Sequence, residues 1–553
     1  MCGIYFYLGG KLDEKCTQHT CLKARGPDEC KIIQTDDYYS AFYRLAIVGL
    51  KNGMQPFVSD ELVLLCNGEI YNYKFLESQF KLPTKSKSDC ECILHLYKKY
   101  GMQFTLNQLD GEFAFMLWDS NKKLLYFARD RLGRKPLFYA WQNNKFEICS
   151  LYAGLTIGGK EQVTPRNLYT YDLTTNLLSI RPYHQFLYTL GNTSKKDLYL
   201  AFVNAVCKRI DQSERPVGFL LSGGFDSSLV LSVALQEGKL KQPPHVFTIG
   251  FSNEAPDVKS AELMVNWLQK KYGTNCIKWH KIISTIEDGL QAIPNVIDIL
   301  ETYDTTTIRA STPMYLISKY IAKNTDVKVI LSGEGSDELF GGYLYFKYAP
   351  DDKAFRVEII DRLNELYLYD VLRADRTTAA WGLEIRPPFL DDDFVEKTLN
   401  CAYLKTGKTN TKELIRDCVA EYKLLPDEIL HGKKEAFSDA VGLEWKERIQ
   451  AHADQFVKEF LTEEIIEQPV NIHDGYELFS SYKSNWALAK TPHEYSKHIV
   501  PETNEMKYFQ YLFNRKFPDS WHLLPHLWLP NQNWVKTGVE PSARILPNYD
   551  MKK

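Results

Sequence analysis

The stretch from Pro216 to Ser228, PVGFLLSGGFDSS, decides the fold of the larger part of this chain. An apolar run leads into two glycines and small hydroxyl residues, and a helical run of apolar residues follows. Glycines let the backbone approach a ligand closely, and free N–H groups at the start of a helix bind phosphate well. The stretch therefore predicts a strand, a phosphate-binding loop and a helix; the alternative is a plain turn capped by Asp226.

Strand and helix patterns alternate through the region that follows. His245–Phe251 and Val327–Leu331 are apolar strand-like runs, and Lys259–Tyr272 has helical spacing. Alternation of this kind is typical of an α/β fold, here a doubly wound parallel sheet covered by helices. The region from 350 to 490 has mostly helical patterns, and the tail after it, rich in Pro, Trp and Asn, gives no fold prediction.

A second small-residue loop, Ser332–Glu338 (SGEGSDE), follows the third predicted strand. Asp226 and Asp337 would then lie at the carboxyl ends of parallel strands, where such sheets bind ligands. Carboxylate and phosphate oxygens are the ligands that Mg²⁺ prefers. We therefore expect Asp226 and Asp337 to hold Mg²⁺; a salt bridge or a helix cap is the alternative role for either residue.

The first part of the chain has a different pattern, in which short runs rich in Val, Ile, Phe and Tyr alternate with turn formers. One helix is predicted after a capping-box pattern at Ser88–Glu91, with Gly101 at its end. We expect an α+β domain of packed antiparallel sheets over residues 1–190, and a second domain over 191–553 that begins with a polar linker. The runs expected as strands are Ser40–Val48, Glu61–Cys66, Gly111–Trp118, Lys123–Ala128, Pro136–Trp141 and Phe146–Cys149.

The chain opens Met1-Cys2-Gly3. Removal of the initiator Met would leave Cys2 with a free α-amine, whose ordinary pKa of about 7.7–8.0 lets it act as a base near neutral pH. Nucleophile and base would then belong to one residue, as in other enzymes with a terminal-amine base. The alternative is a cysteine that stands at this position by chance.

Composition narrows the function classes. Hydrophobic residues make up 44% of 553 residues and the formal net charge is −3, as in an ordinary globular protein with no general attraction to nucleic acid or anionic membrane. No segment reaches the roughly 18 apolar residues that a membrane span needs. The twelve cysteines contain no C-x-x-C pair, which disfavours a zinc ribbon and suits a reducing, cytoplasmic compartment.

Several motifs of the first domain occur together with Cys2. They are Arg25–Asp28 (RGPD), Arg44–Val48 (RLAIV), Asn67–Asn72 (NGEIYN), Ser88–Glu91 (SDCE) and Asp130–Leu137 (DRLGRKPL). Together these motifs resemble those of the class II glutamine amidotransferases, the N-terminal-nucleophile glutaminases. The resemblance implies an N-terminal-nucleophile-hydrolase-like αββα sandwich.

The resemblance also implies roles at the glutamine site. The Cys2 thiolate attacks the side-chain amide of L-glutamine, and the Asn67 amide and the Gly68 N–H stabilise the oxyanion. Arg44 holds the α-carboxylate, and Glu69 and Asp89 receive the α-ammonium group. The expected glutamine-binding residues are Arg44, Leu45, Ala46, Ile47, Val48, Asn67, Gly68, Glu69 and Asp89.

Each of these residues has a simpler alternative when it is taken alone. Asn67 and Gly68 could form only a hairpin turn. Asp89 could merely complement a helix dipole. Arg44 could be a surface charge. The joint occurrence of the motifs favours the glutaminase interpretation.

The order of motifs along the whole chain resembles glutamine-hydrolysing asparagine synthetases. The loop at Ser222 resembles the pyrophosphate loop of ATP pyrophosphatases and differs from a Walker loop. The resemblance implies that L-aspartate reacts with ATP to give β-aspartyl-AMP, which ammonia from glutamine converts to asparagine, and that ammonia crosses an internal passage. Further motifs that carry it are Glu301–Asp304, Thr307–Pro313, Phe340–Tyr343, Arg386–Asp391, Lys434–Asp439 and Pro541–Arg544.

The same resemblance implies the residues of the ATP site. Glu334 would accept a proton from the attacking ammonia, and Lys434 would stabilise charge on the phosphoryl and acyl groups. Thr306, Thr307 and Arg309 are candidates for placing aspartate, although Arg309 could instead be a structural ion-pair partner. The expected ATP-binding residues are Leu220, Ser222, Gly223, Gly224, Asp226, Ser227, Ile249, Ser332 and Gly333.

Two departures from the family pattern stand in the first domain. Phe42 occupies a place where family members often have His, and Ser150–Leu155 (SLYAGL) lacks the Glu and Lys of the usual Ser-Glu-x-Lys-Ala-Leu. The second segment is expected near the domain boundary, so its change bears on the coupling of the two sites.

Other interpretations remain open at this point. A ligase that acts on another acid, a tRNA-modifying pyrophosphatase and a regulatory protein without turnover all share parts of the pattern. Near-neutral charge and the missing C-x-x-C speak against the second, and Cys2, Asp226, Glu334 and Lys434 speak against the third. We expect no nucleic-acid or membrane partner; a homodimer is a possible assembly.

Overall fold

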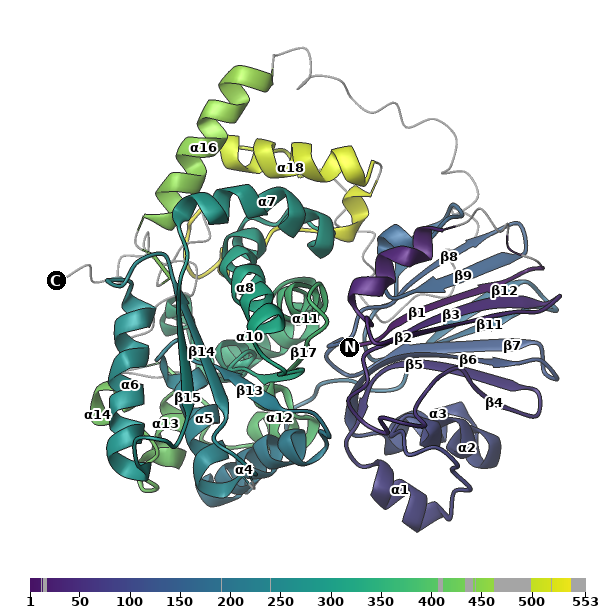
Figure 1. Cartoon of the computed structure of the whole chain (residues 1–553), viewed down its shortest axis with the longest axis horizontal. Coiled ribbons are helices and arrows are strands. Elements are labelled where there is room, and N and C mark those ends of the chain that lie inside the picture. The colour runs from purple at the N-terminus through teal and green to yellow at the C-terminus, as the bar shows by residue number, and fades with distance from the viewer. Residues whose placement is uncertain are drawn as a thin grey trace.

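A computed structural model of the chain describes all residues except 11, 13–16, 190, 239, 406–410, 433–440, 443, 462–498, 519 and 539–553. Two domains lie side by side: the strands of the N-terminal domain form one half, and helices around a parallel sheet form the other (Figure 1). This division confirms the expected two-domain α+β and α/β architecture.

The N-terminal domain contains two six-stranded antiparallel sheets. One has the strand order β10-β8-β9-β1-β3-β2 and the other has the order β12-β11-β7-β6-β5-β4. The six runs expected as strands all form strands with shifted ends. The bounds are β1 Gly3–Leu8, β2 Glu29–Gln34, β3 Tyr38–Arg44, β4 Phe57–Ser59, β5 Leu62–Ile70, β6 Gly111–Asp119, β7 Leu124–Arg129, β8 Phe138–Gln142, β9 Lys145–Cys149, β10 Lys160–Gln162, β11 Asn167–Asp172 and β12 Leu177–Pro182.

Strand β5 shows why several strands are apolar without alternation. Val63 and Leu65 pack into the core between the two sheets, whereas Leu62, Leu64 and Cys66 pack against the helices on the outer face. Successive side chains of a strand point to opposite faces, so a strand that is covered on both sides is apolar throughout. Strand β6 is likewise buried at every position.

Helices cover the outer faces of this sandwich unequally. The face of β5 and β6 is covered by α1 Tyr73–Phe80, α2 Glu91–Tyr100 and α3 Met102–Gln108 (Figure 1). Two short 3₁₀ helices, η1 Gln18–Ala24 and η2 Tyr152–Gly154, lie against each other beside the other sheet. The expected αββα order is therefore present, with 3₁₀ turns as one helical layer among the described residues.

The C-terminal domain is built on five parallel strands in the order β15-β14-β13-β16-β17. Successive strands run outward from β13 in one direction and then resume on its other side at β16, which places the topological switch point between β13 and β16. Ligands of such sheets bind outside the carboxyl ends of the strands at this point. The bounds are β13 Val217–Leu220, β14 His245–Gly250, β15 Lys278–Ile283, β16 Val329–Leu331 and β17 Glu384–Arg386.

The described helices of this domain cover the sheet and extend it, as the helical patterns predict. The Lys259–Tyr272 helix is confirmed within α6. The bounds are α4 Lys195–Asp211, α5 Phe225–Glu237, α6 Pro256–Tyr272, α7 Ile286–Leu300, α8 Thr305–Asn324, α9 Ser336–Phe340, α10 Asp352–Glu365, α11 Asp370–Ala379, α12 Asp392–Leu399, α13 Glu413–Ala420, α14 Asp427–Leu430, α16 Trp445–Phe460 and α18 Asn504–Lys516. No described helix is both long and apolar enough to cross a membrane.

Two local expectations differ from the structure. Ser88 does not cap α2; the helix begins at Glu91 after Cys90, and the Glu91 carboxylate binds the backbone N–H groups of Lys85 and Ser86. The linker expected over residues 190–197 runs into α4, which begins at Lys195, because Ser194 and Asp197 form a complete capping box at the start of this helix.

Candidate active sites

A pocket lies beside Cys2, at the amino end of the central strand β1. Strands β3 and β5, the loop after β3 and the segment before α2 supply its walls. Its lining residues are Cys2, Phe42, Arg44, Leu45, Ile47, Val48, Gly53, Gln55, Cys66, Gly68, Glu69, Ser88, Asp89, Cys90 and Glu384. All but the last belong to the N-terminal domain, so the pocket touches the domain boundary at Glu384.

Asn67 is the residue most directly joined to Cys2. Its Oδ1 accepts a hydrogen bond of 2.8 Å from the backbone nitrogen of Cys2, and its Nδ2 is buried with no hydrogen-bond partner among the described residues. A buried donor without a partner is costly unless a ligand completes it. The hairpin alternative is wrong, because Asn67 and Gly68 lie inside strand β5.

Gly68 is required by packing at this point of the sheet. A Cβ at this position would lie 2.3 Å from the Glu112 carbonyl oxygen of β6. Any side chain would therefore push β5 away from β6 next to the Cys2 pocket.

Arg44 is buried and shapes the loop that follows β3. Its Nη2 donates to the Gly49 carbonyl at 2.7 Å, its Nη1 donates to the Leu50 carbonyl at 3.1 Å, and Glu29 lies 3.3 Å away. The surface-charge alternative is thus wrong. The neighbouring Leu45 carbonyl accepts the Cys2 thiol at a distance of 3.8 Å.

Two carboxylates, those of Asp89 and Glu69, also line the pocket. Asp89 accepts the Ile70 N–H at 2.7 Å, and burial raises the pKa of Asp89 to about 6. Burial also raises the pKa of Glu69 well above its usual value, although the Arg386 guanidinium opposes this. Asp89 contacts the backbone of β5 through this bond, so its role exceeds that of a helix-dipole charge.

Met1 lies buried between the domains. Its ammonium group is 3.4 Å from Glu384 Oε2, and burial lowers the pKa of this ammonium while Glu384 opposes the shift. The Met1 side chain packs with Met314, Ala374, Ala379 and Ile385, and Leu220 borders this cluster. Burial also shifts the pKa of the neighbouring Cys2 thiol, but upward, because the charged form of a thiol is the anion.

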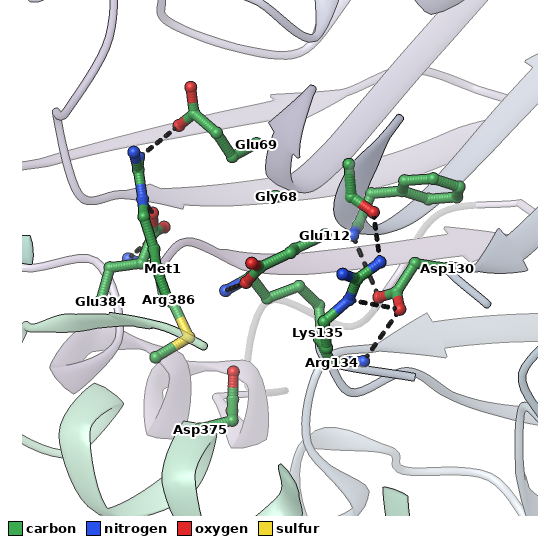
Figure 2. A network of polar contacts seen from close by, with 12 residues as sticks. Met1, Gly68, Glu69, Glu112, Asp130, Arg134, Lys135, Asp375, Glu384 and Arg386 are labelled. Carbon is green, nitrogen blue, oxygen red and sulfur yellow. Dashed lines mark hydrogen bonds and ion pairs between the residues drawn. The ribbon is translucent and has the colours of Figure 1, made fainter. Parts of the chain in front are cut away.

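Ion pairs cross the domain boundary, and Figure 2 shows the pair of Arg386 with Glu69 beside the pocket. Arg386 of β17 binds Glu69 at 2.7 Å and Glu384 at 2.8 Å. Arg134 binds Asp392 at 2.9 Å. All these side chains are nearly or fully buried, so the wall of the Cys2 pocket and strand β17 form one continuous polar structure.

Cys2 itself is tied to this boundary by Arg25. Nε of Arg25 donates to the Cys2 carbonyl at 3.1 Å, and Nη1 lies 2.7 Å from Asp375 of α11. The N-terminal strand is therefore anchored to the C-terminal domain on the side of the carbonyl as well as by Met1.

The two predicted phosphate loops meet at the switch point of the parallel sheet. Gly223 has φ +77°, and a Cβ there would lie 2.1 Å from the Ala261 nitrogen. A Cβ on Gly333 would lie 2.7 Å from Cβ of Asp226, which shows how closely the second loop approaches the first. Ser222 and Ser227 hold the first loop through a contact of 3.1 Å between their hydroxyls.

The remaining expected ATP residues surround these loops. Leu220 ends β13, Ile249 lies in β14, and Gly224 immediately precedes α5. The Ser332 hydroxyl is buried with no partner among the described residues. The plain-turn alternative does not explain two such loops side by side.

Asp226 and Asp337 share one cation, the ammonium group of Lys412. Nζ of Lys412 lies 2.7 and 2.6 Å from the two oxygens of Asp226 and 2.8 Å from Oδ1 of Asp337. The expected pair of carboxylates is therefore brought together at a position that binds positive charge. Lys412 stands in none of the quoted motifs.

Glu334 faces Arg373 of α11. Their N–O distance is 2.6 Å, and Arg373 also binds Asp370 at 2.7 Å. Burial raises the pKa of Glu334, and the Arg373 charge limits the shift. Nearby, the Tyr343 hydroxyl donates to Glu338, whose pKa burial raises well above its usual value.

The residues expected near aspartate differ in their contacts. The Arg309 guanidinium binds both carboxylate oxygens of Glu505 from α18, at 2.8 and 2.5 Å, which fits the structural ion-pair alternative. Thr307 donates to Asp304 at 2.7 Å, whereas the Thr306 hydroxyl is buried without a partner among the described residues. Lys434 lies outside the described residues, as does the Pro541–Arg544 motif.

The two sequence departures have clear positions. Phe42 is fully buried between the sheets and lines the Cys2 pocket. The Ser150–Leu155 segment lies at the domain boundary, where the Glu301 carboxylate accepts the backbone N–H groups of Tyr152 and Ala153 at 3.0 and 2.8 Å.

Sequence reasoning missed Lys412, Arg373 and the pair of Glu384 with Met1. Arg386 belongs to a quoted motif, but nothing in that motif indicates that it pairs with Glu69, since the two are 317 residues apart. Lysine and arginine are common surface residues, and only their burial in the fold distinguishes these from the others.

Comparisons with known proteins agree with this geometry. The family described as "Glutamine amidotransferase domain" matches residues 1–188, and the family "Asparagine synthase" matches 197–358 and 349–493. A solved amidotransferase from B. subtilis has 15% sequence identity and a TM-score of 0.29, too low to support an inference.

Curated relatives match along the whole length. "Asparagine synthetase [glutamine-hydrolyzing]" of Gallus gallus is 37% identical over 99% of both chains, and the protein of that name in Homo sapiens is also 37% identical over 99% of both. A "Probable asparagine synthetase [glutamine-hydrolyzing]" of Acanthamoeba polyphaga mimivirus is 36% identical over 99% of this chain. The chain therefore belongs to the family of glutamine-hydrolysing asparagine synthetases.

Proposed function

We propose that the chain makes L-asparagine from L-aspartate, ATP and the amide nitrogen of L-glutamine, and releases AMP, diphosphate and L-glutamate. Full-length similarity to the relatives supports the overall reaction. We assign glutamine hydrolysis to residues 1–190 and asparagine synthesis to residues 191–553. The chain is thus a carbon–nitrogen ligase with two sites.

The observation that carries the glutaminase assignment is the orientation of the Asn67 amide. Its Oδ1 holds the Cys2 nitrogen, which becomes the free α-amine once Met1 is removed, and its unpartnered Nδ2 can donate to an oxyanion. The Cys2 thiolate attacks the glutamine amide carbon and ammonia leaves. Water then releases glutamate from the thioester.

Arg44, Glu69 and Asp89 would orient the glutamine. Arg44 has the planar fork that suits a carboxylate, and Glu69 and Asp89 have acceptors for an ammonium group. One oxygen of Glu69 is buried without a partner among the described residues, which supports a role in binding a donor. Leu45, Ile47 and Val48 form the wall beside Cys2, whereas the expected Ala46 does not line the pocket and its N–H donates to Asp28.

Ammonia would cross the boundary beneath Met1. The cluster of Met1, Met314, Ala374, Ala379 and Ile385 is apolar and buried, and Leu220 borders it from the end of β13. Loss of Met1 would vacate part of this cluster between Cys2 and the ATP loops. An apolar route favours neutral ammonia over ammonium, because burial disfavours the charged form.

ATP would bind at the switch point. The phosphates would contact the loop N–H groups and hydroxyls, and the adenosine would lie against Leu220, Ile249, Ser332 and Gly333. The donor set of Asp226 and Asp337 suits Mg²⁺, because both are hard carboxylates and already share a cation. Bound there, Mg²⁺ would neutralise phosphate charge. The phosphate-loop residues are Ser222, Gly223, Gly224, Asp226 and Ser227.

The aspartate side-chain carboxylate attacks the α-phosphorus of ATP, and diphosphate leaves. Ammonia then attacks the acyl carbon of β-aspartyl-AMP, Glu334 accepts a proton, and AMP leaves. A raised pKa suits a base that works near neutral pH. Lys434 would stabilise the charge on the phosphoryl and acyl groups.

Three further points belong to the proposal. Thr306 is the favoured aspartate-binding residue, ahead of Thr307 and Arg309, because its hydroxyl is buried without a partner among the described residues. We also propose a cytoplasmic location, which the free thiols of the described cysteines and the need for a reduced Cys2 support. A homodimer is the assembly to test.

Product analysis with ATP, aspartate and amide-labelled glutamine tests the function. Labelled asparagine, AMP and diphosphate are expected, and ADP in place of AMP would overturn the adenylation step. Glu334→Gln should block asparagine formation even with free ammonia supplied. Undiminished turnover by this variant would remove Glu334 from the mechanism.

A further inference from the structure

The cation between Asp226 and Asp337 belongs to the chain itself. Lys412 directly precedes α13, and its side chain is 2% exposed. Its ammonium is within 2.8 Å of an oxygen of each carboxylate, so one side chain joins the two phosphate loops. The ammonium places one positive charge between the two carboxylates.

The surrounding structure is shaped to admit this lysine. Gly342 follows the second loop, and a Cβ there would lie 2.2 Å from Cε of Lys412 and 2.1 Å from Oδ1 of Asp337. Gly342 does not have the left-handed backbone that favours glycine. Its missing side chain is therefore explained by the space that Lys412 and Asp337 require.

The backbone of Lys412 is fixed in an unusual conformation. It has φ 60° and ψ 31°, the left-handed region that residues other than glycine adopt rarely. One turn later, Arg416 donates to the Thr411 carbonyl at 3.0 Å and stacks on the Phe225 ring, with its guanidinium carbon 4.5 Å from the ring centre. Phe225 adjoins Asp226, so α13 is fastened to the same loop that Lys412 reaches.

We propose that Lys412 is a built-in counter-cation that competes with a divalent metal for Asp226 and Asp337, so that metal binds well only together with ATP. This inference rests on the proposed ATP site. Metal and ammonium would need the same carboxylate oxygens, and their like charges repel at such short distances. The phosphates of ATP offer Lys412 new acceptors nearby, which makes its departure favourable only when nucleotide and metal arrive together.

The competition can be measured without turnover. Mn²⁺ is the probe, and the electron paramagnetic resonance signal of the free ion reports its binding to the full chain in the absence of nucleotide. Lys412→Met keeps the length of the side chain and removes its charge. We expect this variant to bind Mn²⁺ about tenfold or more tightly than the unaltered chain, as for ordinary coupling between competing ligands.

A second variant and a control complete the test. Lys412→Gln, which also removes the charge, should bind Mn²⁺ more tightly than the unaltered chain. Lys195→Met removes an exposed ion pair with Asp417 and should leave Mn²⁺ binding unchanged. Mn²⁺ binding by Lys412→Met and Lys412→Gln that is no tighter than in the unaltered chain, or absent, would overturn the proposal.

A second measurement on the unaltered chain covers the case in which both variants fail to fold. A non-hydrolysable ATP analogue should make the chain retain more Mn²⁺ than chain and analogue retain separately. Mn²⁺ retention by the mixture that only equals the sum of the amounts retained by the chain and by the analogue separately would overturn the proposal. Asparagine formation by the unaltered chain tests the proposed function separately, because the Mn²⁺ titration of the nucleotide-free chain involves no substrate.

Discussion

Arg386 and Glu69 form a buried ion pair of 2.7 Å between Nη2 and Oε2 that joins strand β17 to the wall of the Cys2 pocket. Arg386 comes from the parallel sheet and Glu69 from an antiparallel sheet of the other domain. A residue of the domain that is proposed to bind ATP thus contacts the wall of the proposed glutamine site. Figure 2 shows the same guanidinium next to Glu384 and Met1.

Replacement of Arg386 by Met should destabilise the protein strongly. Glu69 and Glu384 would lose a partner while they stay buried, and removal of one member of a buried pair typically costs about 3–5 kcal/mol. Urea unfolding measures the loss. Arg181→Met, at an exposed position, is the control. The double variant with Glu69→Gln should lose less than the sum of its parts; strict additivity would contradict direct coupling.

Replacement of Cys2 by Ala should abolish glutamine-dependent asparagine formation and leave ammonia-dependent formation intact. The thiol is the proposed nucleophile of the first site only, and the loops proposed to bind ATP belong to the other domain. Assays with glutamine and with ammonium chloride separate the two activities. Loss of both activities in a folded variant would sink the division of labour. Mass spectrometry should also find Met1 removed, since a retained Met1 leaves no free amine on Cys2.

Replacement of Asn67 by Ala should reduce the kcat for glutamine hydrolysis about 10²–10³-fold, the usual effect of losing one oxyanion donor. Its unpartnered Nδ2 is the reason, together with the contact of Oδ1 to the Cys2 nitrogen. Asn107→Ala, on the exposed face of α3, serves as the control. A loss confined to KM would indicate that Asn67 binds glutamine without stabilising the oxyanion.

Glutamine binding should weaken as pH falls through about 6, because burial raises the pKa of Asp89 to about 6. Above this pH the carboxylate is charged and attracts the substrate ammonium; below it, Asp89 is neutral and the attraction is lost. The pH profile of kcat/KM for the glutaminase reaction reports the change. In Asp89→Asn the profile should lose this inflection, and an unchanged inflection would assign it to another group.

Replacement of Gly223 by Ala should impair the ATP-dependent half of the reaction alone. The new Cβ would lie 2.1 Å from the Ala261 nitrogen, and φ +77° is unfavourable for alanine. Misplacement of a loop by about 1 Å can cost about 10²-fold in rate. Gly224→Ala meets only the Ser222 hydroxyl at 3.3 Å and should cost less. Equal losses in both variants, or a parallel loss of glutaminase activity, would contradict the local explanation.

Local sequence patterns predict those parts of the fold whose structure depends on neighbouring residues in the sequence. The run from Pro216 to Ser228 predicts β13, its loop and the start of α5, because strand pattern, glycines and helix pattern follow one another without a gap. Alternation of strands and helices then predicts the parallel sheet. The tail helix α18 was not predicted: it depends on partners such as Arg309, almost two hundred residues earlier, which bind its Glu505.

The candidate-site residues also fall into those that a local motif predicts and those that only the packing of the fold reveals. Residues in contiguous motifs, such as Asn67 and Asp337, are predicted as site residues from sequence, whereas Lys412 is not. It lies 186 residues from Asp226, and its neighbours in sequence give no sign that its ammonium is buried. Long-range ion pairs follow from the packing of whole elements, which a single sequence does not specify.

The contact of Glu301 with the 150–155 segment has a consequence for how this boundary can evolve. Glu301 accepts the N–H groups of Tyr152 and Ala153, which every residue except proline provides. The two bonds from Glu301 therefore persist when the side chains at these two positions change, unless proline enters. Tyr152 has a further constraint, because its hydroxyl accepts a hydrogen bond from the Ser520 hydroxyl at 2.7 Å. Ala153 is thus a position at which this boundary can vary without loss of these hydrogen bonds.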